Sequence, residues 1–219
     1  MQYPLIEYIN AEDLANAVED EFGVMYSKDG LKLLDANDSI IKYVVKSGTR
    51  VICDRAFADC SGLTSVTIPN SVTSIGGYAF YGCSGITRPI IVNDMFVFLP
   101  KSYKGHYSIP ENISKIIGGA FSDCVYLTSV TIPNSVTSIG DEAFFGCRGL
   151  TSVTIPNSVK SIGDGAFKNI DVVYYSGSAT GAPWGANRVL PYNDRRNECI
   201  TITTNNLRRT INEIVNKLI

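Results

Sequence analysis

The decapeptide LTSVTIPNSV begins at Leu63, again at Leu127 and again at Leu150. Each copy continues through Ser-Ile-Gly to an Ala-Phe pair, and the same pair occurs twice more in the chain. The resulting series of phenylalanines is Phe57, Phe80, Phe121, Phe144 and Phe167. All intervals in this series are equal except the one from Phe80 to Phe121, which is much longer. A fixed period of this kind is the signature of a repeat architecture, here with one insertion.

Each repeat contains a strand and a turn. The segment from Ser65 to Ile68 alternates polar and apolar residues, as a strand with one buried face does. Pro69 has no N–H to donate and marks the end of the strand, and Gly76 permits the backbone to turn. One repeat therefore makes one coil. Because a single coil cannot bury its own apolar side, we expect coils to stack about 4.8 Å apart, with equivalent side chains in continuous columns.

A longer pattern, LxxVxIPxxVxxIGxxAFxxC, runs from Leu63 to Cys83 and from Leu127 to Cys147, and it returns from Leu150 without its last cysteine. This pattern resembles the BspA-type leucine-rich repeat, over residues 40 to 173 or so. The resemblance implies a right-handed leucine-rich repeat solenoid of the α/β repeat class, built mainly of short parallel β-strands. The chain departs from the general leucine-rich consensus, which has an asparagine ladder, at Ser71, Ser135 and Ser158.

The inserted residues predict a β-hairpin. They include IIVNDMFVFLP (residues 90–100), two β-rich runs around an Asn-Asp turn. A similar turn signal, Asp29-Gly30, separates VMYSK from LKLL near the N-terminus. Asp29 precedes Ala56 by the same interval as Asn93 precedes Ala120, and each alanine belongs to an Ala-Phe pair. We therefore expect hairpin insertions near residues 24–34 and 90–100 that project from the stack.

Both ends of the stack need polar covers, since they expose apolar columns. Asn10 is a good N-cap, and Leu14, Val18 and Phe22 follow at helical spacing, so residues 1–23 predict an N-terminal capping helix. The solenoid is expected over residues 24–175. A C-terminal cap, residues 176–219, should end in a helix whose apolar stripe is Leu207, Ile211, Ile214, Val215 and Leu218. Either helix could instead dock a partner.

The composition narrows the class of protein. Of the 219 residues, 45% are hydrophobic and 18% are charged, which is enough for a sizeable core. The formal charge is −2, with lysines and arginines scattered, so neither nucleic acid nor an anionic membrane surface is an expected partner. No apolar run approaches the ~20 residues of a membrane span. The N-terminus lacks the features of a secretory signal, which favours the cytoplasm, whereas the family resemblance implies the cell surface or secretion.

The cysteines and the single histidine offer little chemistry. Four cysteines occupy one repeat position and should form an inward column of buried thiols that fill space: Cys60, Cys83, Cys124 and Cys147. Cys53 and Cys199 lie off this column, and their state stays open. No CxxC, P-loop, GxSxG or HExxH pattern occurs, so no catalytic residue, cofactor or metal is predicted. A remote alternative is a thiol hydrolase that uses Cys199 with His106.

The outward positions of the main strands are mostly hydroxyl-bearing. One column is Ser65, His106, Ser129 and Ser152, and the other is Thr67, Ser108, Thr131 and Thr154. Serine and threonine suit any solvated strand face, but the strip could also be a contact surface. We expect the insertion to wall one side of it with Met95, Phe96, Phe98, Tyr103 and Tyr107. The prediction is a non-enzymatic protein-binding module with an unidentified protein ligand. The resemblance implies bacterial adhesion or host interaction, and an intracellular protein–protein scaffold is the alternative.

Overall fold

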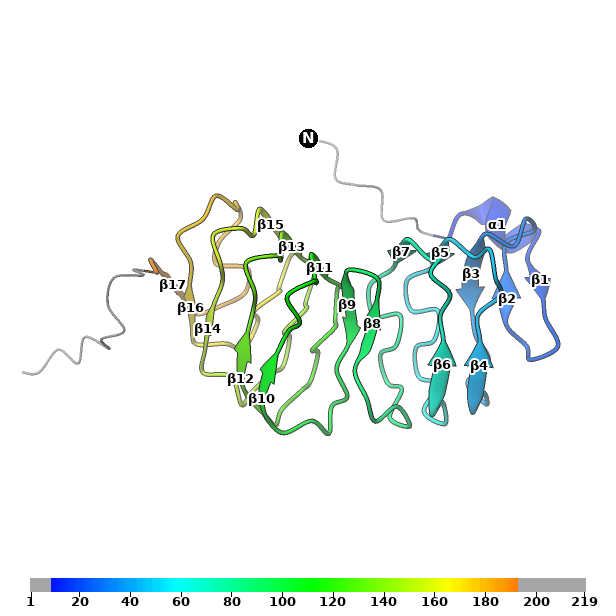
Figure 1. Cartoon of the computed structure of the whole chain (residues 1–219), viewed down its shortest axis with the longest axis horizontal. Helices are drawn as coiled ribbons and strands as arrows, with labels where there is room; N and C mark the ends of the chain where they lie inside the picture. Colours follow the sequence, from blue (N-terminus) through cyan, green and yellow to red (C-terminus); the bar gives the residue numbers. More distant parts are fainter. Residues whose placement is uncertain (1–8, 193–219) are drawn as a thin grey trace, which may run out of the picture.

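Short strands recur at the period of the repeat because each repeat presents the same alternation of apolar and polar residues. The computed structural model describes residues 9–192, and Figure 1 shows them wound into an elongated stack of coils. A regular coil has three sides. The first and second sides each carry one strand, and the third side carries the turn with the Ala-Phe pair. The parallel β-solenoid predicted from the sequence is confirmed.

The first side consists of strands that pair in parallel with the equivalent strand of a neighbouring coil. These strands are β4 (Lys42–Val44), β6 (Ser65–Thr67), β10 (Gly105–Ser108), β12 (Leu127–Thr131), β14 (Ser152–Thr154), β16 (Val172–Tyr174) and β17 (Arg188–Leu190). Val66 of β6, for example, lies opposite Tyr43 of β4, one coil earlier. The hydrogen-bonded groups are β4–β6, β10–β12 and β14–β16–β17. The insertion therefore separates β6 from β10.

The second side forms two five-stranded sheets. The first sheet has the order β1 (Val18–Glu19), β2 (Met25–Tyr26), β3 (Lys32–Asp35), β5 (Val51–Ile52) and β7 (Ser74–Ile75). The second has the order β8 (Ile90–Val92), β9 (Met95–Phe98), β11 (Lys115–Ile116), β13 (Ser138–Ile139) and β15 (Ser161–Ile162). From β3 onward, strands of successive coils are parallel, and β8 runs antiparallel to β9.

The third side carries no strand, yet its backbone also forms a ladder between coils. The amide of Phe57 donates to the carbonyl of Ala79 over 2.8 Å, and the amide of Phe121 donates to the carbonyl of Ala143 over 2.8 Å. These bonds satisfy backbone groups that would otherwise be buried without a partner. They also place the Ala-Phe pairs of successive coils directly above one another.

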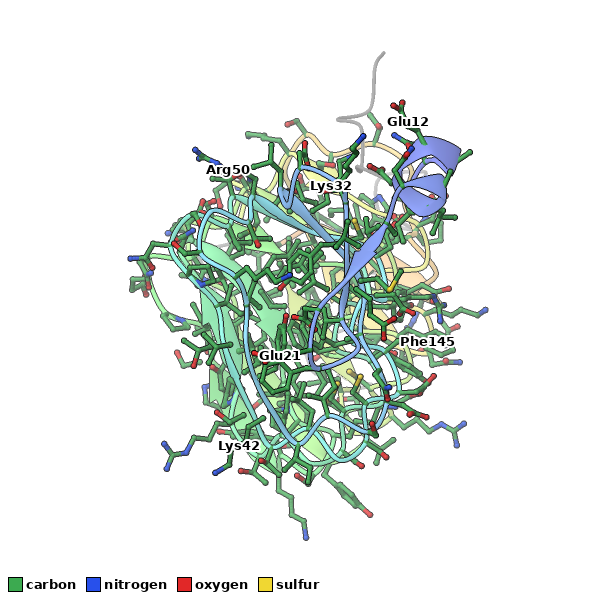
Figure 2. All side chains as sticks on the ribbon, turned by 90° about the vertical axis from the view of Figure 1, so that its right-hand side faces the viewer. Glu12, Glu21, Lys32, Lys42, Arg50 and Phe145 are labelled. Atoms are coloured by element: carbon green, nitrogen blue, oxygen red, sulfur yellow. The ribbon has the colours of Figure 1, made fainter. Side chains whose placement is uncertain are left out.

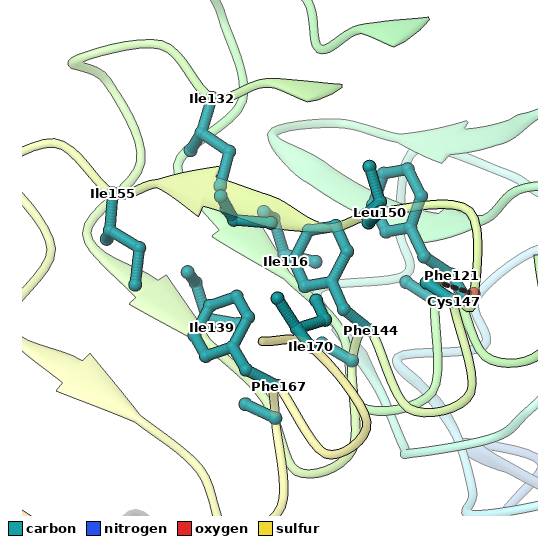
Figure 3. Packing of buried hydrophobic residues seen from close by; sticks show 14 of the residues in the cluster. Ile116, Phe121, Ile132, Ile139, Phe144, Cys147, Leu150, Ile155, Phe167 and Ile170 are labelled. Carbon is teal, nitrogen blue, oxygen red and sulfur yellow. Dashed lines mark hydrogen bonds between the residues drawn. The ribbon is translucent and has the colours of Figure 1, made fainter. Parts of the chain in front are cut away.

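Phenylalanine rings form the centre of the core. Phe144 stacks on Phe121 with ring centroids 4.6 Å apart and on Phe167 with centroids 5.4 Å apart, and the rings are nearly parallel. Figure 3 shows these rings among the isoleucines of the second side, such as Ile139. Because the period places one ring above the next, each regular coil packs on its neighbour with the same contacts.

The cysteine column points inward, as predicted. The Cys147 thiol donates to the carbonyl of Phe121 over 3.0 Å, a contact drawn in Figure 3, and the Cys83 thiol donates to the carbonyl of Phe57 over 3.0 Å. Cysteine suits this position because it is a small apolar side chain with one weak donor. The column thus fills space and pairs a carbonyl at each turn.

The two predicted hairpins exist, but neither projects from the stack. β9 pairs in parallel with β11, and all four of its residues are buried. The N-terminal hairpin of β2 and β3 is likewise part of its sheet, because β3 pairs in parallel with β5. The run MFVF in residues 95–98 has no polar residue, so both faces of this strand need cover. Incorporation into the sheet provides it, and the prediction of a projecting insertion is wrong.

The N-terminal end is covered differently from the prediction. Asn10 caps α1 (Ala11–Ala15) in a capping box with Asp13, but the helix ends at Ala15. The chain then forms β1, which pairs antiparallel with β2. Leu14, Val18 and Phe22, the expected apolar stripe, are 63%, 50% and 56% exposed. Pairing the open edge of β2 with another strand satisfies backbone groups that a helix would leave bare.

The C-terminal end of the solenoid lies one coil beyond the expected boundary at residue 175. β17 pairs in parallel with β16, and Trp184 stands where the next Ala-Phe turn would be. The amide of Phe167 donates to the carbonyl of Trp184 over 3.0 Å, and the Trp184 side chain is buried. The expected terminal helix lies outside the described residues.

Candidate binding surface

Six exposed side chains form a strip across three neighbouring strands of the first side. They are His106 and Ser108 on β10, Ser129 and Thr131 on β12, and Ser152 and Thr154 on β14. We call this set the hydroxyl strip. The residues between them, such as Val153, face the core. The outward orientation predicted for these positions is confirmed.

His106 is held within the strip by its neighbours. Its Nδ1 atom lies 2.8 Å from Ser129 Oγ, and its Nε2 atom lies 3.3 Å from Thr131 Oγ1. Both contacts follow from the register, which sets His106 opposite Ser129. A histidine beside a serine is also found in nucleophilic enzymes, but there a carboxylate orients the ring. Here the second nitrogen faces a threonine hydroxyl, so the arrangement fixes a ring in a surface and lacks the third member of a triad.

Ser65 and Thr67 are exposed on β6, as predicted, but they are not continuous with the hydroxyl strip. The insertion intervenes, and Pro89 occupies the position that Val66 has one coil earlier. A proline cannot donate to a strand ladder, so no first-side strand forms at this level. The sequence-predicted columns are therefore divided into a short N-terminal part and the longer hydroxyl strip.

The expected aromatic wall of the strip is largely wrong. Met95, Phe96 and Phe98 are buried in β9 and belong to the core, so they cannot contact a partner. Tyr103 is half-buried at the edge of the strip, where its hydroxyl donates to the carbonyl of His106 over 2.9 Å. The polar turn in residues 93–94 suggested an exposed hairpin, but the apolar run after it carries the decisive signal.

Tyr103 connects the strip to the core through aromatic contacts. Its ring packs edge-on against Tyr107, with centroids 5.3 Å apart, and Tyr107 packs edge-on against Phe96, with centroids 5.4 Å apart. Pairs of this kind add about 0.5–1.5 kcal/mol beyond the area that they bury. The backbone beneath His106 is therefore supported by a chain of packed rings.

The cysteine column offers no nucleophile. Burial raises the pKa of Cys60 to about 11 and the pKa values of Cys83 and Cys124 to about 12, and it raises the pKa of Cys147 as well. Since the thiolate is the reactive form, these groups stay inert at neutral pH. The pair considered for a thiol hydrolase includes Cys199, which lies outside the described residues.

Within residues 9–192 we also considered metal-binding side chains and membrane-spanning helices. No group of three or more His, Cys, Asp and Glu side chains in this range is arranged to hold a metal ion. No helix in the same range is long and apolar enough to cross a membrane.

Two hollows flank the inserted coil, which comprises residues 86–126, and the sequence prediction missed both. One, of about 510 Å³, lies between Ile86, Phe98 and Tyr126, with the Lys101–Asp123 ion pair at its rim. The other, of about 220 Å³, lies on the third side over Ser122. A signal for the second exists, because Ser122 is small where the adjacent coils have aromatic residues. Only an alignment of the coils, column by column, shows it.

A family model that describes six copies of the BspA type leucine rich repeat region matches residues 35–116 and 97–178. None of the curated proteins matches the chain. Among solved structures, a leucine rich cell surface protein from Faecalibacterium prausnitzii is 25% identical, with a TM-score of 0.44, over 72% of this chain and 54% of that chain.

Two other solved structures are similar to the chain. A leucine rich repeat protein from T. pallidum is 28% identical, with a TM-score of 0.41, over 72% of each chain. A leucine-rich repeat protein from Bacteroides ovatus is 23% identical, with a TM-score of 0.40, over 75% of this chain and 51% of that chain. The chain spans about half the length of the F. prausnitzii and B. ovatus proteins.

Proposed function

The chain belongs to the BspA-type leucine-rich repeat family, and from this premise we propose that it is a non-enzymatic recognition module that binds a protein through the hydroxyl strip. Leucine-rich repeat proteins are in general binding modules without catalytic activity, and they use extended faces of the stack. We extend the proposal to a host or matrix protein as the partner, in bacterial adhesion. This extension rests on the family resemblance.

The observation that carries the proposal is the geometry of the strip. Six exposed side chains without a formal charge lie on three neighbouring strands, and His106 is fixed by hydrogen bonds to Ser129 and Thr131. A surface that is already ordered loses little conformational entropy on binding. Hydroxyl groups and an imidazole also supply both donors and acceptors to the backbone and side chains of a partner.

The test is binding of the full chain to a panel of purified extracellular-matrix proteins, measured by surface plasmon resonance. We expect saturable binding to at least one of them. The double substitution Thr131→Lys and Thr154→Lys places two charged, long side chains in the strip, and it should weaken that binding at least about tenfold, because central contacts carry most of an interface's energy.

The matched control is Thr73→Lys, which makes the same change at an exposed threonine just before β7 of the second side. It should leave the affinity unchanged. Circular dichroism should show that all variants keep the fold, since the substituted side chains face solvent. Binding that is indifferent to the strip substitutions, or that falls equally in the control, contradicts the proposal.

A further inference from the structure

A small cavity lies on the third side of the solenoid, away from the hydroxyl strip. Its volume is about 220 Å³, and its lining residues are Arg55, Tyr78, Tyr81, Ser122, Glu142 and Phe145. Figure 2, viewed along the stack, shows Phe145 on one flank of the molecule and Lys42 of the first-side strand β4 on the opposite flank. The cavity is therefore independent of the surface considered above.

The cavity exists because the inserted coil has small residues where its neighbours have large ones. In one column of the third side, Ser122 stands between Tyr81 and Phe145 of the adjacent coils. In the next column, Gly119 stands between Tyr78 and Glu142. Two neighbouring columns of this coil thus have a small residue between larger ones, and the Tyr78 ring covers the gap at Gly119.

Tyr78 lies across the gap at Gly119. A Cβ atom added to Gly119 would come within 2.5 Å of the Tyr78 ring, so only glycine permits this position of the ring. The Tyr78 hydroxyl reaches over the inserted coil and donates a hydrogen bond to Glu142. Burial, and after it the Glu142 carboxylate, raise the pKa of Tyr78, so the phenol stays protonated and remains a donor. The ring and the carboxylate together form one wall of the cavity.

Ser122 has an unsatisfied hydroxyl. Its residue is only 4% exposed, and its Oγ atom has no hydrogen-bond partner among the described residues. A buried polar atom left without a partner costs about 1–3 kcal/mol, so such atoms call for an explanation. Because Ser122 lines the cavity, a rotation about its Cα–Cβ bond would turn the buried hydroxyl toward a ligand there, and a ligand hydroxyl would then supply the missing partner.

The charges around the cavity favour a ligand without net charge. Each of its three aromatic rings already has a cation of this chain nearby: Arg55 at 5.2 Å from the Tyr78 ring centroid, Lys101 at 4.0 Å from that of Tyr81, and Lys168 at 5.4 Å from that of Phe145. A cationic ligand would have to compete with these side chains. An anionic ligand would face the Glu142 carboxylate directly.

We propose that this cavity binds a single neutral pyranose ring, such as a terminal hexose of a glycan. A pyranose has hydroxyl groups, each both donor and acceptor, and it carries no charge that would have to compete with the cations over the three rings. Ser122, the Arg55 guanidinium and the Glu142 carboxylate provide the complementary donors and acceptors. At about 220 Å³ the cavity is smaller than the sites of about 300–1,000 Å³ that hold drug-sized ligands, which suits one sugar ring and no more.

The test uses the full chain and three probes: the methyl glycosides of glucose, galactose and mannose. Saturation-transfer NMR detects binding, and amide chemical shifts of the isotope-labelled protein locate it. We expect at least one glycoside to bind with a dissociation constant on the order of 1 mM, a weak affinity that matches a small ligand in a shallow site. The shifts should concentrate at Gly119 and Ser122.

The substitution Ser122→Phe gives the inserted coil the kind of residue that its neighbours have, so it should keep the fold while it fills the cavity. It should abolish sugar binding. The matched control Ser108→Phe makes the same change in the hydroxyl strip and should leave sugar binding intact. The second variant, Ser122→Ala, removes only the unsatisfied hydroxyl and should weaken binding several-fold while it preserves the packing.

Three results would overturn the proposal. The first is that no glycoside binds the wild-type chain. The second is that Ser122→Phe and Ser122→Ala both bind as well as the wild type, or that the shifts lie elsewhere. The third is a preference for charged probes, namely methyl glucuronide or methyl glucosaminide, over the neutral glycosides. Because the strip variants should leave sugar binding unchanged, the outcome is independent of the function proposed above.

Discussion

The regular coils of residues 127–170 and the inserted coil of residues 86–126 solve the same packing problem in different ways. In the regular coils, the fixed period places each phenylalanine above the last, and Phe144 stacks on both of its neighbours. In the inserted coil, the stretch from Phe80 to Phe121 is longer than one period, and the ring that stacks on Phe121 comes from Phe96 of β9, with centroids 4.6 Å apart. The hairpin thus supplies the ring that extends the C-terminal part of the phenylalanine column beyond Phe121, while Phe80 lies in the other core cluster.

The inserted coil leaves a boundary in the molecule between β7 and β8, where the second-side sheet is interrupted, and we call this boundary the seam. Phe96 belongs to the C-terminal core cluster, whereas its neighbours Met95, Val97 and Phe98 belong to the N-terminal cluster. The second-side sheet that ends at β7 is not hydrogen-bonded to the sheet that begins at β8. A solenoid therefore tolerates an insertion when the added residues bring their own core side chains. The continuity of the second-side strand ladder is lost in return, whereas the third-side backbone stays hydrogen-bonded from Tyr78 to Gly118.

The seam is also where the surface departs from regularity. Both hollows described above have lining residues from the inserted coil, whereas the regular coils present flat strands to solvent. Repetition fixes the core because every coil must match the next. The inserted coil does not repeat, so its surface can form a hollow that the regular coils do not have.

The largest expected effect concerns Phe96 and Phe144. Truncation of either fully buried ring to alanine should cost about 3–5 kcal/mol of unfolding free energy. The two variants should differ in cooperativity. Phe144→Ala leaves the β11–β13–β15 ladder to couple its neighbours, whereas Phe96→Ala removes a ring of β9 that packs on Phe121 beside the place where no ladder joins β7 to β8. Urea unfolding followed by circular dichroism should show one transition for Phe144→Ala and two for Phe96→Ala.

A single transition for Phe96→Ala would mean that the two core clusters unfold as one unit despite the broken sheet. Two transitions in the wild type would mean that the seam is already decoupled. Either result would revise the comparison between the two kinds of coil.

The next effect concerns Gly140, where close packing between coils excludes a side chain, and Gly105, where the backbone has a positive φ. In the regular coils, a Cβ atom at Gly140 would lie 2.4 Å from the backbone nitrogen of Gly118, so Gly140→Ala should cost about 1–3 kcal/mol through steric overlap. In the inserted coil, Gly105 has open space around it but a φ of +89°, so Gly105→Ala should cost about 1–2 kcal/mol through backbone strain alone. Chemical denaturation of both variants measures these costs.

Asparagine distinguishes the two causes. Gly105→Asn should recover part of the loss because asparagine tolerates left-handed backbone, whereas Gly140→Asn should be at least as damaging as alanine. The same response at both sites would remove the distinction between close coil packing at Gly140 and turn geometry at Gly105.

The sequence predicted those features that depend on the repeat period. The inward columns of phenylalanine and cysteine and the outward hydroxyl positions are all confirmed, because stacking demands that equivalent residues face the same way. The prediction of an N-terminal helix was wrong beyond Ala15. The helical spacing of Leu14, Val18 and Phe22 gives no information about the unpaired edge of β2, with which β1 pairs. Helix propensity is local, whereas the edge of a sheet arises only in the assembled fold.

The site predictions failed where the period fails. Met95, Phe96 and Phe98 were assigned to the surface because of the turn that precedes them, yet a run without polar residues indicates burial on both faces. The cavity over Ser122 depends on Tyr81, one coil before it, and on Phe145, one coil after it. Such contacts are invisible along the chain and appear only when the columns are compared.

The smallest expected effect tests whether two carboxylates of the third side interact across the inserted coil. Asp54 Oδ1 accepts a hydrogen bond from the amide of Gly77 over 2.6 Å, and burial raises the pKa of this carboxyl, with a further contribution from Asp141 on the far side of the inserted coil. A raised carboxyl pKa means that the folded state holds the proton more tightly than the unfolded state. Stability from this group is therefore present at low pH and is lost as the pH rises through the folded-state pKa.

At pH 7 the ionised Asp54 should consequently be unfavourable, and Asp54→Asn should stabilise the protein by less than about 1 kcal/mol, because the side chain stays partly solvated. The gain should shrink as the pH falls toward the carboxyl's ordinary value of 3.8. In a double-mutant cycle, Asp141→Asn should reduce the gain by a few tenths of a kcal/mol at most, roughly the lower limit of resolvable coupling. Asp164→Asn, one coil further along, is the control and should not couple. A cycle without coupling at low salt would show that the inserted coil separates the two carboxylates electrostatically, even though the third-side backbone is hydrogen-bonded from Tyr78 to Gly118.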